Sequence, residues 1–60
     1  MNIFFRCVCN GETAWISDEG KVESLEDAKK LALYTLKLYS PLEAVVIEDD
    51  ESNELMWVWG

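Results

Sequence analysis

The dipeptide Asn10-Gly11 constrains the fold of this chain more than any other feature. It separates two segments rich in aromatic and β-branched residues, IFFRCVC (3–9) and ETAWIS (12–17). A type I′ turn needs positive φ at both central residues, which Asn and Gly tolerate, and its twist suits a β-hairpin. The sequence therefore predicts an antiparallel hairpin over residues 3–17, followed by a second turn at DEGK (18–21).

A single segment, SLEDAKKLALYTLKLYS (24–40), has the pattern of a helix. Ser24 is a favourable N-cap, and Glu26 and Asp27 suit the positive end of the helix dipole. Lys37 suits the other end, and Pro41 prevents further winding. At about 100° per residue, one arc of this helix is predicted to be buried. It contains Leu25, Ala28, Ala32, Thr35, Leu36 and Tyr39.

A second hairpin is predicted after the helix, from EAVVIE (43–48), the acidic turn DDESN (49–53) and ELMWVW (54–59). The order of elements is ββαββ. One helix on one face of a four-stranded sheet is the natural two-layer arrangement for these elements. The predicted fold class is therefore α+β, in a single small domain that comprises residues 1–60.

The short length limits the size of the hydrophobic core, and the composition limits the metal ligands that the domain can offer. A chain of this size buries only about 60% of the surface that its unfolded form exposes, and small folds often recruit metals, disulfides or partner subunits. Two cysteines and no histidine disfavour a zinc site within one chain, and we expect no metal and no cofactor. Cys7 and Cys9 are predicted to be small buried thiols in a reducing cytoplasm. The alternatives are a redox pair or a metal shared across a dimer.

Membrane and nucleic-acid partners are both disfavoured. No segment approaches the run of about 18 apolar residues that a membrane span requires, and the first ten residues do not resemble a signal peptide. We therefore expect a cytoplasmic protein. The net charge of −7 opposes direct binding to nucleic acid or to an anionic membrane, because either needs a basic surface.

Strand alternation sorts the side chains of the predicted sheet into two faces. The smaller ones suit the space beneath the helix: Ile3, Phe5, Cys7, Ala14, Ile16, Val45, Ile47, Met56 and Val58. The larger ones then lie on the uncovered face: Phe4, Val8, Trp15, Trp57 and Trp59. Several large aromatic side chains together exceed the apolar patch that a soluble monomer usually exposes. The alternative is the reverse assignment, in which the tryptophans form the core.

The helix carries a second apolar stripe outside its buried arc. Leu31, Tyr34 and Leu38 are spaced i, i+3, i+7, which favours contact with a helix of a partner or of another copy. Alternatively, Leu31 and Leu38 cover the edge of the sheet while Tyr34 keeps its hydroxyl in water. The candidate apolar interface, for a partner or for a dimer, consists of Leu31, Tyr34, Leu38, Trp15, Trp57 and Trp59.

Most of the acidic residues are predicted to gather at one end of the molecule. Each hairpin reverses the chain and the helix reverses it again, so the second turn, the helix start and the last turn meet at the same end. Ten of the twelve acidic residues lie there, with Lys21 as their only close cation. This end is either a solvated surface, a calcium site, or a surface that meets a basic partner. The candidate partner-binding carboxylates are Asp18, Glu19, Glu23, Glu26, Asp27, Asp49, Asp50 and Glu51.

The sequence favours a binding protein over an enzyme. It has no histidine, no glycine-rich phosphate loop, and no serine or cysteine beside an evident base. Carboxylates on solvated turns are poor acid–base catalysts at neutral pH. The leading hypothesis is a stoichiometric inhibitor that presents carboxylates to the basic, nucleic-acid-binding surface of another protein. In composition alone, the chain resembles phage-encoded inhibitors of CRISPR or restriction enzymes, which would place it in the host cytoplasm.

The alternative hypothesis is a homodimeric structural or accessory protein. In that case the aromatic sheet face or the outer helix stripe forms a two-fold interface, and the acidic end only keeps the dimer soluble.

Overall fold

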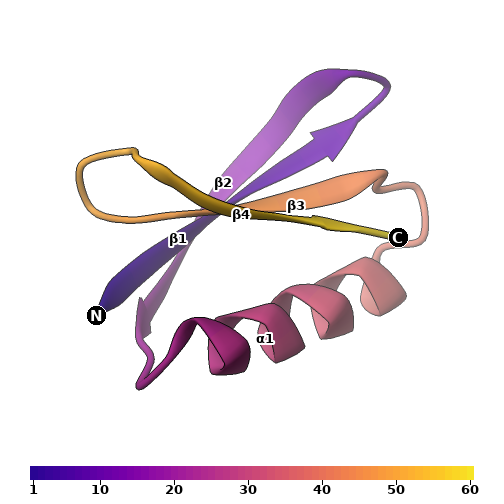
Figure 1. Ribbon diagram of the computed structural model, residues 1–60. Coiled ribbons are helices and arrows are strands. Elements are labelled where there is room, and N and C mark those ends of the chain that lie inside the picture. The colour runs from indigo at the N-terminus through magenta and orange to yellow at the C-terminus, as the bar shows by residue number, and fades with distance from the viewer.

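The computed structural model covers residues 1–60 and has the predicted order of elements. Strands β1 (Asn2–Cys9) and β2 (Glu12–Lys21) precede the helix α1 (Leu25–Leu38), and strands β3 (Ala44–Glu48) and β4 (Glu54–Trp59) follow it. The four strands form one antiparallel sheet in the order β2-β1-β3-β4. The helix lies on one face of this sheet (Figure 1). The predicted α+β fold class is confirmed.

The local signals read from the sequence have direct counterparts in the structure. Asn10 and Gly11 have φ values of 54° and 76°, as a type I′ turn requires. The Ser24 hydroxyl accepts a hydrogen bond of 3.2 Å from the backbone N–H of Asp27, which satisfies one of the free donors at the helix start. The helix ends at Leu38, before Pro41.

The main core lies between α1 and the sheet. Ala28, Ala32 and Leu36 are the buried residues of the helix, and the two alanines allow close approach to the strands. The sheet side of the core contains Ile3, Phe5, Cys7, Val45, Ile47 and Val58. The predicted faces of β1, β3 and β4 are therefore confirmed, and Trp57 and Trp59 lie on the face opposite the helix.

The predicted face of β2 is wrong, and a β-bulge is the reason. An uninterrupted hairpin with a two-residue turn would place Ala14 opposite Cys7. Instead, Trp15 pairs with Cys7 while Thr13 pairs with Val8, which leaves Ala14 as an extra residue. Because a shift of one residue exchanges the two faces of a strand, Trp15 lies on the helix side. Ile16 lies on the open face and is exposed.

The predicted turn at residues 18–21 is also wrong, because β2 continues through Lys21. A second register shift occurs here: Asp18 pairs with Phe4 and Gly20 pairs with Ile3, so Glu19 is the extra residue. Gly20 has φ of 75°, a value that glycine adopts without strain. The glycine marks a bulge within a long strand rather than the end of a short one.

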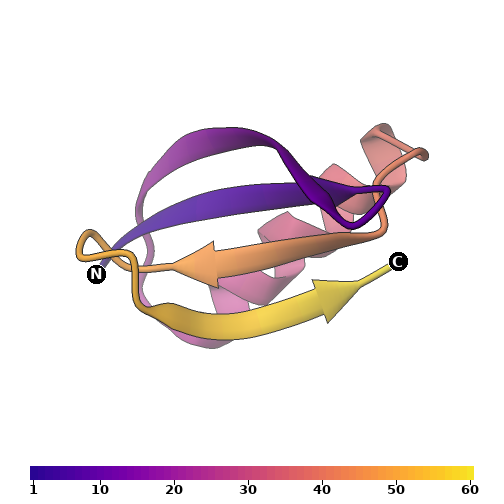
Figure 2. The same ribbon diagram turned by 90° about the horizontal axis from the view of Figure 1, so that it is seen from above.

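The helix covers only part of its face of the sheet. It packs mainly against β3 and β4, whereas β2 bows outward at the opposite edge (Figure 2). The inner face of β2 therefore has no helix above it. This offset creates the groove described below.

Candidate functional site

Ten of the twelve acidic residues, all except Glu12 and Glu43, lie at the end of the molecule where the chain passes from β2 to α1. The β3–β4 turn and the start of α1 are at the same end (Figure 1), which follows from the alternating directions of successive elements. None of the eight carboxylates predicted to bind a partner forms an ion pair, because both ion pairs of the protein belong to Arg6. Six of the eight side chains are exposed, and those of Glu19 and Asp49 are half-buried.

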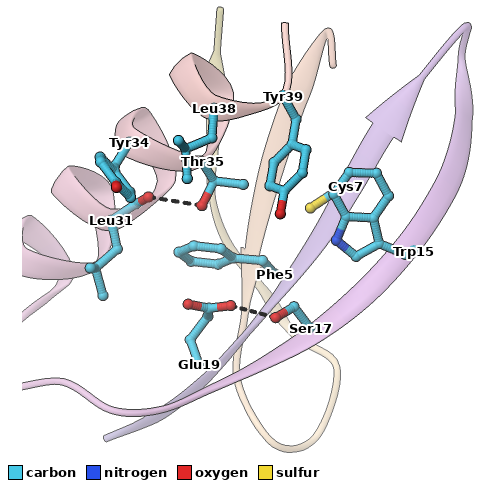
Figure 3. A pocket seen from close by; sticks show the side chains of 10 residues that line it. All are labelled: Phe5, Cys7, Trp15, Ser17, Glu19, Leu31, Tyr34, Thr35, Leu38 and Tyr39. Carbon is cyan, nitrogen blue, oxygen red and sulfur yellow. Dashed lines mark hydrogen bonds between the residues drawn. The ribbon is translucent and has the colours of Figure 1, made fainter. Parts of the chain in front are cut away.

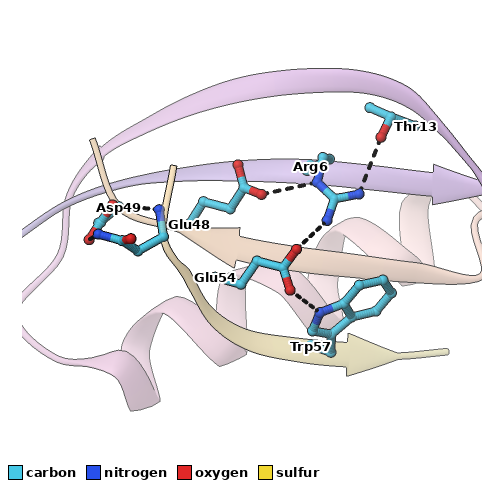
Figure 4. Close-up of polar contacts among 7 residues, drawn as sticks. Arg6, Thr13, Glu48, Asp49, Glu54 and Trp57 are labelled. Carbon is cyan, nitrogen blue, oxygen red and sulfur yellow. Dashed lines mark hydrogen bonds and ion pairs between the residues drawn. The ribbon is translucent and has the colours of Figure 1, made fainter. Parts of the chain in front are cut away.

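Two further carboxylates at this end are neutralised within the fold. The guanidinium of Arg6 reaches Glu48 through Nε (3.0 Å) and Glu54 through Nη2 (2.9 Å), as Figure 4 shows. The hydrogen bond with Glu48 is the largest cause of a raised pKa at Arg6. The prediction that Lys21 is the only cation close to these carboxylates is therefore wrong. Arg6 approaches from the middle of the open face because β1 and β3 are neighbours in the sheet.

Asp49 organises the β3–β4 turn. Its Oδ1 accepts the backbone N–H groups of Glu51 and Asn53, each at 2.9 Å, and its Oδ2 accepts the Asn53 side-chain amide at 2.9 Å. These bonds, first of all the one from the Asn53 side chain, lower the pKa of Asp49 below its ordinary value. The turn therefore holds its remaining carboxylates, Asp50 and Glu51, on a defined loop.

We expect Asp49→Asn to destabilise the protein at neutral pH and to have a smaller effect in acid. A carboxylate whose pKa is lowered by folding contributes stability above its unfolded pKa of about 3.9, and this contribution is lost as the pH falls through the folded-state pKa. Denaturation midpoints of both proteins, measured from about pH 6 to pH 2, should converge at the acid end. Asp50→Asn is the control, because it removes the same charge from the same turn without removing a hydrogen bond. Equal midpoints of wild type and Asp49→Asn at pH 6 would contradict this role.

The open face of the sheet is covered by its own side chains. Val8, Ala44 and Val46 are buried there although no helix lies above them. Trp57 and Trp59 stack with ring centroids 5.3 Å apart, and the Arg6 guanidinium lies 5.5 Å from the centroid of Trp57. The indole N–H of Trp57 donates to Glu54 at 2.9 Å. Tryptophan, arginine and glutamate side chains thus form a single layer over the open face of the sheet. Trp59 lies at the edge of this layer and remains 63% exposed.

A groove of about 350 Å³ lies between α1 and β2 on the other face. Phe5 and Cys7, both fully buried, form its floor. The helix contributes the stripe of Leu31, Tyr34 and Leu38, which faces the groove across from β2 (Figure 3). All three side chains of this stripe are more than 40% exposed, so the groove is open to solvent.

The opposite wall of the groove comes from β2 and from the residue that follows α1. Trp15 packs edge-on against Tyr39, with ring centroids 5.3 Å apart. Ser17 and Glu19 line the groove farther along β2, and the Ser17 hydroxyl donates to Glu19 at 2.5 Å. The groove is therefore aromatic and aliphatic near Trp15 and carries a carboxylate at Glu19.

The structure divides the predicted apolar interface between two surfaces. Leu31, Tyr34 and Leu38 meet Trp15 at the groove, whereas Trp57 and Trp59 lie on the opposite face of the sheet. Tyr39 and Ser17 were not among the predicted site residues. Gly20 within β2 could have indicated the second bulge, since an isolated glycine in a strand often marks one. No comparable signal marks the bulge at Ala14.

Both cysteine thiols are free. Cys7 is buried in the floor of the groove, where burial and then the charge of Glu19 raise the pKa of its thiol. It packs as a small apolar side chain. Cys9 is half-buried and its thiol donates to the carbonyl of Pro41 at 3.4 Å.

Comparison with known proteins does not assign this chain to a family: no family model, curated protein or solved structure matches it. Its helix is neither long enough nor apolar enough to cross a bilayer. No three or more His, Cys, Asp or Glu side chains are grouped so that they could hold a metal ion.

Proposed function

We propose that this protein is a stoichiometric binding module whose acidic end docks on the basic, nucleic-acid-binding surface of another protein and inhibits it. The observation that carries the proposal is the set of eight carboxylates at one end of the molecule, none of which has an ion-pair partner in the fold. The only arginine is engaged with Glu48 and Glu54, so it neutralises none of the eight.

Electrostatics explain why such a surface suits a partner. Like charges at one end repel each other and cost stability, and this cost is relieved when cationic side chains approach. A complementary field also speeds the encounter of two proteins and disfavours partners of the wrong charge. A compact body that carries carboxylates on a defined turn and a helix start can occupy a Lys/Arg groove that otherwise binds phosphates.

The composition supports a more specific version of the same proposal. Phage-encoded inhibitors of CRISPR or restriction enzymes are likewise small, acidic, single-domain proteins. A protein of that kind would act in the host cytoplasm. Two free thiols are in keeping with a reducing compartment.

Displacement of proteins from immobilised DNA tests the proposal directly. Double-stranded DNA on cellulose is loaded with the DNA-binding proteins of a bacterial lysate and washed with the purified protein. We expect it to elute one or a few discrete proteins, and the effect should weaken as salt rises from about 50 to 200 mM. No eluted protein at low salt, or elution that does not depend on salt, would contradict the proposal.

Two matched charge variants make this test specific. Asp50→Asn/Glu51→Gln removes two carboxylates from the acidic end, and Glu12→Gln/Glu43→Gln removes two from the opposite end. In the control variant, glutamine at position 43 can still accept the 2.8 Å hydrogen bond from Gly11 N–H. At about 0.7 kcal/mol for each exposed charge pair, the first variant should displace protein about tenfold less efficiently. The control should match wild type, because the net charges of the two variants are equal.

A homodimeric accessory protein is the second candidate, and the exposed pair of Trp57 and Trp59 favours it. These side chains are 40% and 63% exposed on the open face, where a two-fold contact could cover them. Light scattering across a concentration series should then show a dimer that persists at high salt. A monomer at high micromolar concentration would exclude this candidate.

A further inference from the structure

The groove between α1 and β2 lies beside a free sheet edge. β2 is the outermost strand, so its outward N–H and C=O groups are available to another strand. Its two bulges, at Ala14 and Glu19, enclose the regularly paired segment Trp15–Asp18. The regular edge is therefore short, which suits a short extended peptide better than the long pairing of two large sheets.

Side chains of such a peptide would find a space that is already formed. Because α1 lies over β3 and β4, the inner face of β2 is uncovered and opens onto the groove (Figures 2 and 3). In a peptide paired with the free edge of β2, alternate side chains would lie on the same face as Trp15, Ser17 and Glu19, the β2 residues that line the groove. Main-chain pairing combined with side-chain pockets is a known mode of peptide recognition.

The two ends of the groove differ in chemistry. Trp15, Tyr39 and Leu38 make one end apolar. At the other end, the half-buried carboxylate of Glu19 bonds only to the Ser17 hydroxyl and has no cationic partner. Asp27 precedes Leu31 by four residues, so it extends the helix stripe at this end with a second carboxylate. A ligand that matches the groove therefore has an apolar and a cationic side chain on the same face.

We propose that the groove between α1 and β2 binds an extended segment of a partner protein, which adds to the free edge of β2 and places an apolar side chain beside Trp15 and a lysine or arginine beside Glu19. A second copy of this protein fits less well, because the Trp15–Asp18 segment of its own β2 carries no lysine or arginine to place beside Glu19.

This inference goes beyond the proposed function and does not depend on it. The carboxylates at the tip of the acidic end, Asp50 and Glu51, do not line the groove. Asp50→Asn/Glu51→Gln should therefore bind a groove peptide as wild type does. If the wild-type protein bound the peptide but displaced nothing from DNA, only the proposed function would be contradicted, and if it displaced protein from DNA but did not bind the peptide, only the groove would be contradicted.

The probe is the acetylated and amidated peptide Thr-Lys-Thr-Val-Thr-Leu-Thr. Paired antiparallel to β2, it places lysine opposite Glu19, valine opposite Ser17 and leucine opposite Trp15. In ¹⁵N-labelled protein we expect saturable NMR shifts of the β2 amides and of the Trp15 indole, and slower exchange of the outward β2 amides. The control peptide Thr-Lys-Thr-Val-Leu-Thr-Thr puts lysine and leucine on opposite faces, and we expect it to bind at least fivefold more weakly.

Matched protein variants distinguish specific binding in the groove from nonspecific binding to exposed apolar side chains. Leu38→Ala should weaken binding about fivefold because it removes part of the apolar wall. Leu33→Ala, another exposed leucine of α1 that does not line the groove, should have no effect. Glu19→Gln should weaken binding of the lysine peptide about threefold, as expected for a partly exposed charge pair.

Three outcomes of the peptide-binding experiments would overturn the proposal. They are the absence of saturable shifts in β2 and Trp15, equal binding of the two peptides, and equal effects of Leu38→Ala and Leu33→Ala. A wild-type protein that already forms a dimer with protected outward β2 amides would also overturn it, because the occupant would then be a second copy.

Discussion

The variant Phe5→Ala is expected to be largely unfolded at room temperature. Phe5 is among the largest fully buried side chains of the protein, and truncation of a buried phenylalanine costs about 3–5 kcal/mol. In a domain of this size, a single hydrophobic core rarely supplies more than about 3–5 kcal/mol of stability. The expected loss is therefore comparable with the whole free energy of unfolding.

The position of Phe5 explains why its neighbours cannot compensate. It pairs with Ser17 on one side and Ile47 on the other, in a core cluster that also contains the helix residues Ala28 and Ala32. Small side chains on a helix that is already close to the sheet cannot fill a cavity of this size. The cavity would also join the groove, because Phe5 forms the groove floor.

Chemical denaturation followed by circular dichroism checks this prediction, with Phe4→Ala as the matched control. Phe4 is the adjacent residue of β1, and its side chain is half-buried on the open face. We expect its truncation to cost about 1 kcal/mol, the centre of the range for single substitutions. If Phe5→Ala were no less stable than Phe4→Ala, the main core would not be centred beneath the helix.

Arg6→Ala is expected to lower the free energy of unfolding by about 2–3 kcal/mol. Removing one member of a buried ion pair costs about 3–5 kcal/mol, because it leaves an uncompensated buried charge. The Glu48 side chain is only 11% exposed, whereas that of Arg6 is 23% exposed, so solvent reduces the expected effect. Glu54 and Trp57 also lose a neighbour, since the guanidinium contacts both.

A double-mutant cycle measures the coupling between Arg6 and Glu48. In a Glu48→Gln background, Arg6→Ala should cost about half as much, because the carboxylate is then absent. Lys21→Ala is the control for charge alone, since Lys21 forms no ion pair. Equal costs of Arg6→Ala in both backgrounds would mean that the ion pair with Glu48 contributes little and that Arg6 acts through its other contacts, with Glu54 and Trp57.

Much of the fold could be predicted because its signals are local. Asn10-Gly11 specifies a turn through the φ values that its residues tolerate, and Ser24 specifies a helix start through one hydrogen bond. Alternation along β1, β3 and β4 identifies the buried face because a strand has a period of two residues. These properties depend only on neighbours in the sequence.

The errors concern β2 and Arg6, and both have non-local causes. The bulge at Ala14 exchanges the faces of Trp15 and Ile16, and nothing in ETAWIS marks it. In the structure it places Trp15 against Tyr39 and Cys7, residues from two other segments. Arg6 likewise finds Glu48 and Glu54 only because β1 and β3 are adjacent in the sheet.

The same distinction holds for the candidate site. The sequence alone determined that the acidic segments share one end, because two hairpins and a helix reverse the chain in alternation whatever the strand order. Only the tertiary structure decided which carboxylates remain unpaired, since Arg6 crosses between strands to engage two of them. Only the tertiary structure created the groove, because its walls depend on how α1 is offset over β3 and β4 and on which way the bulged β2 turns its side chains.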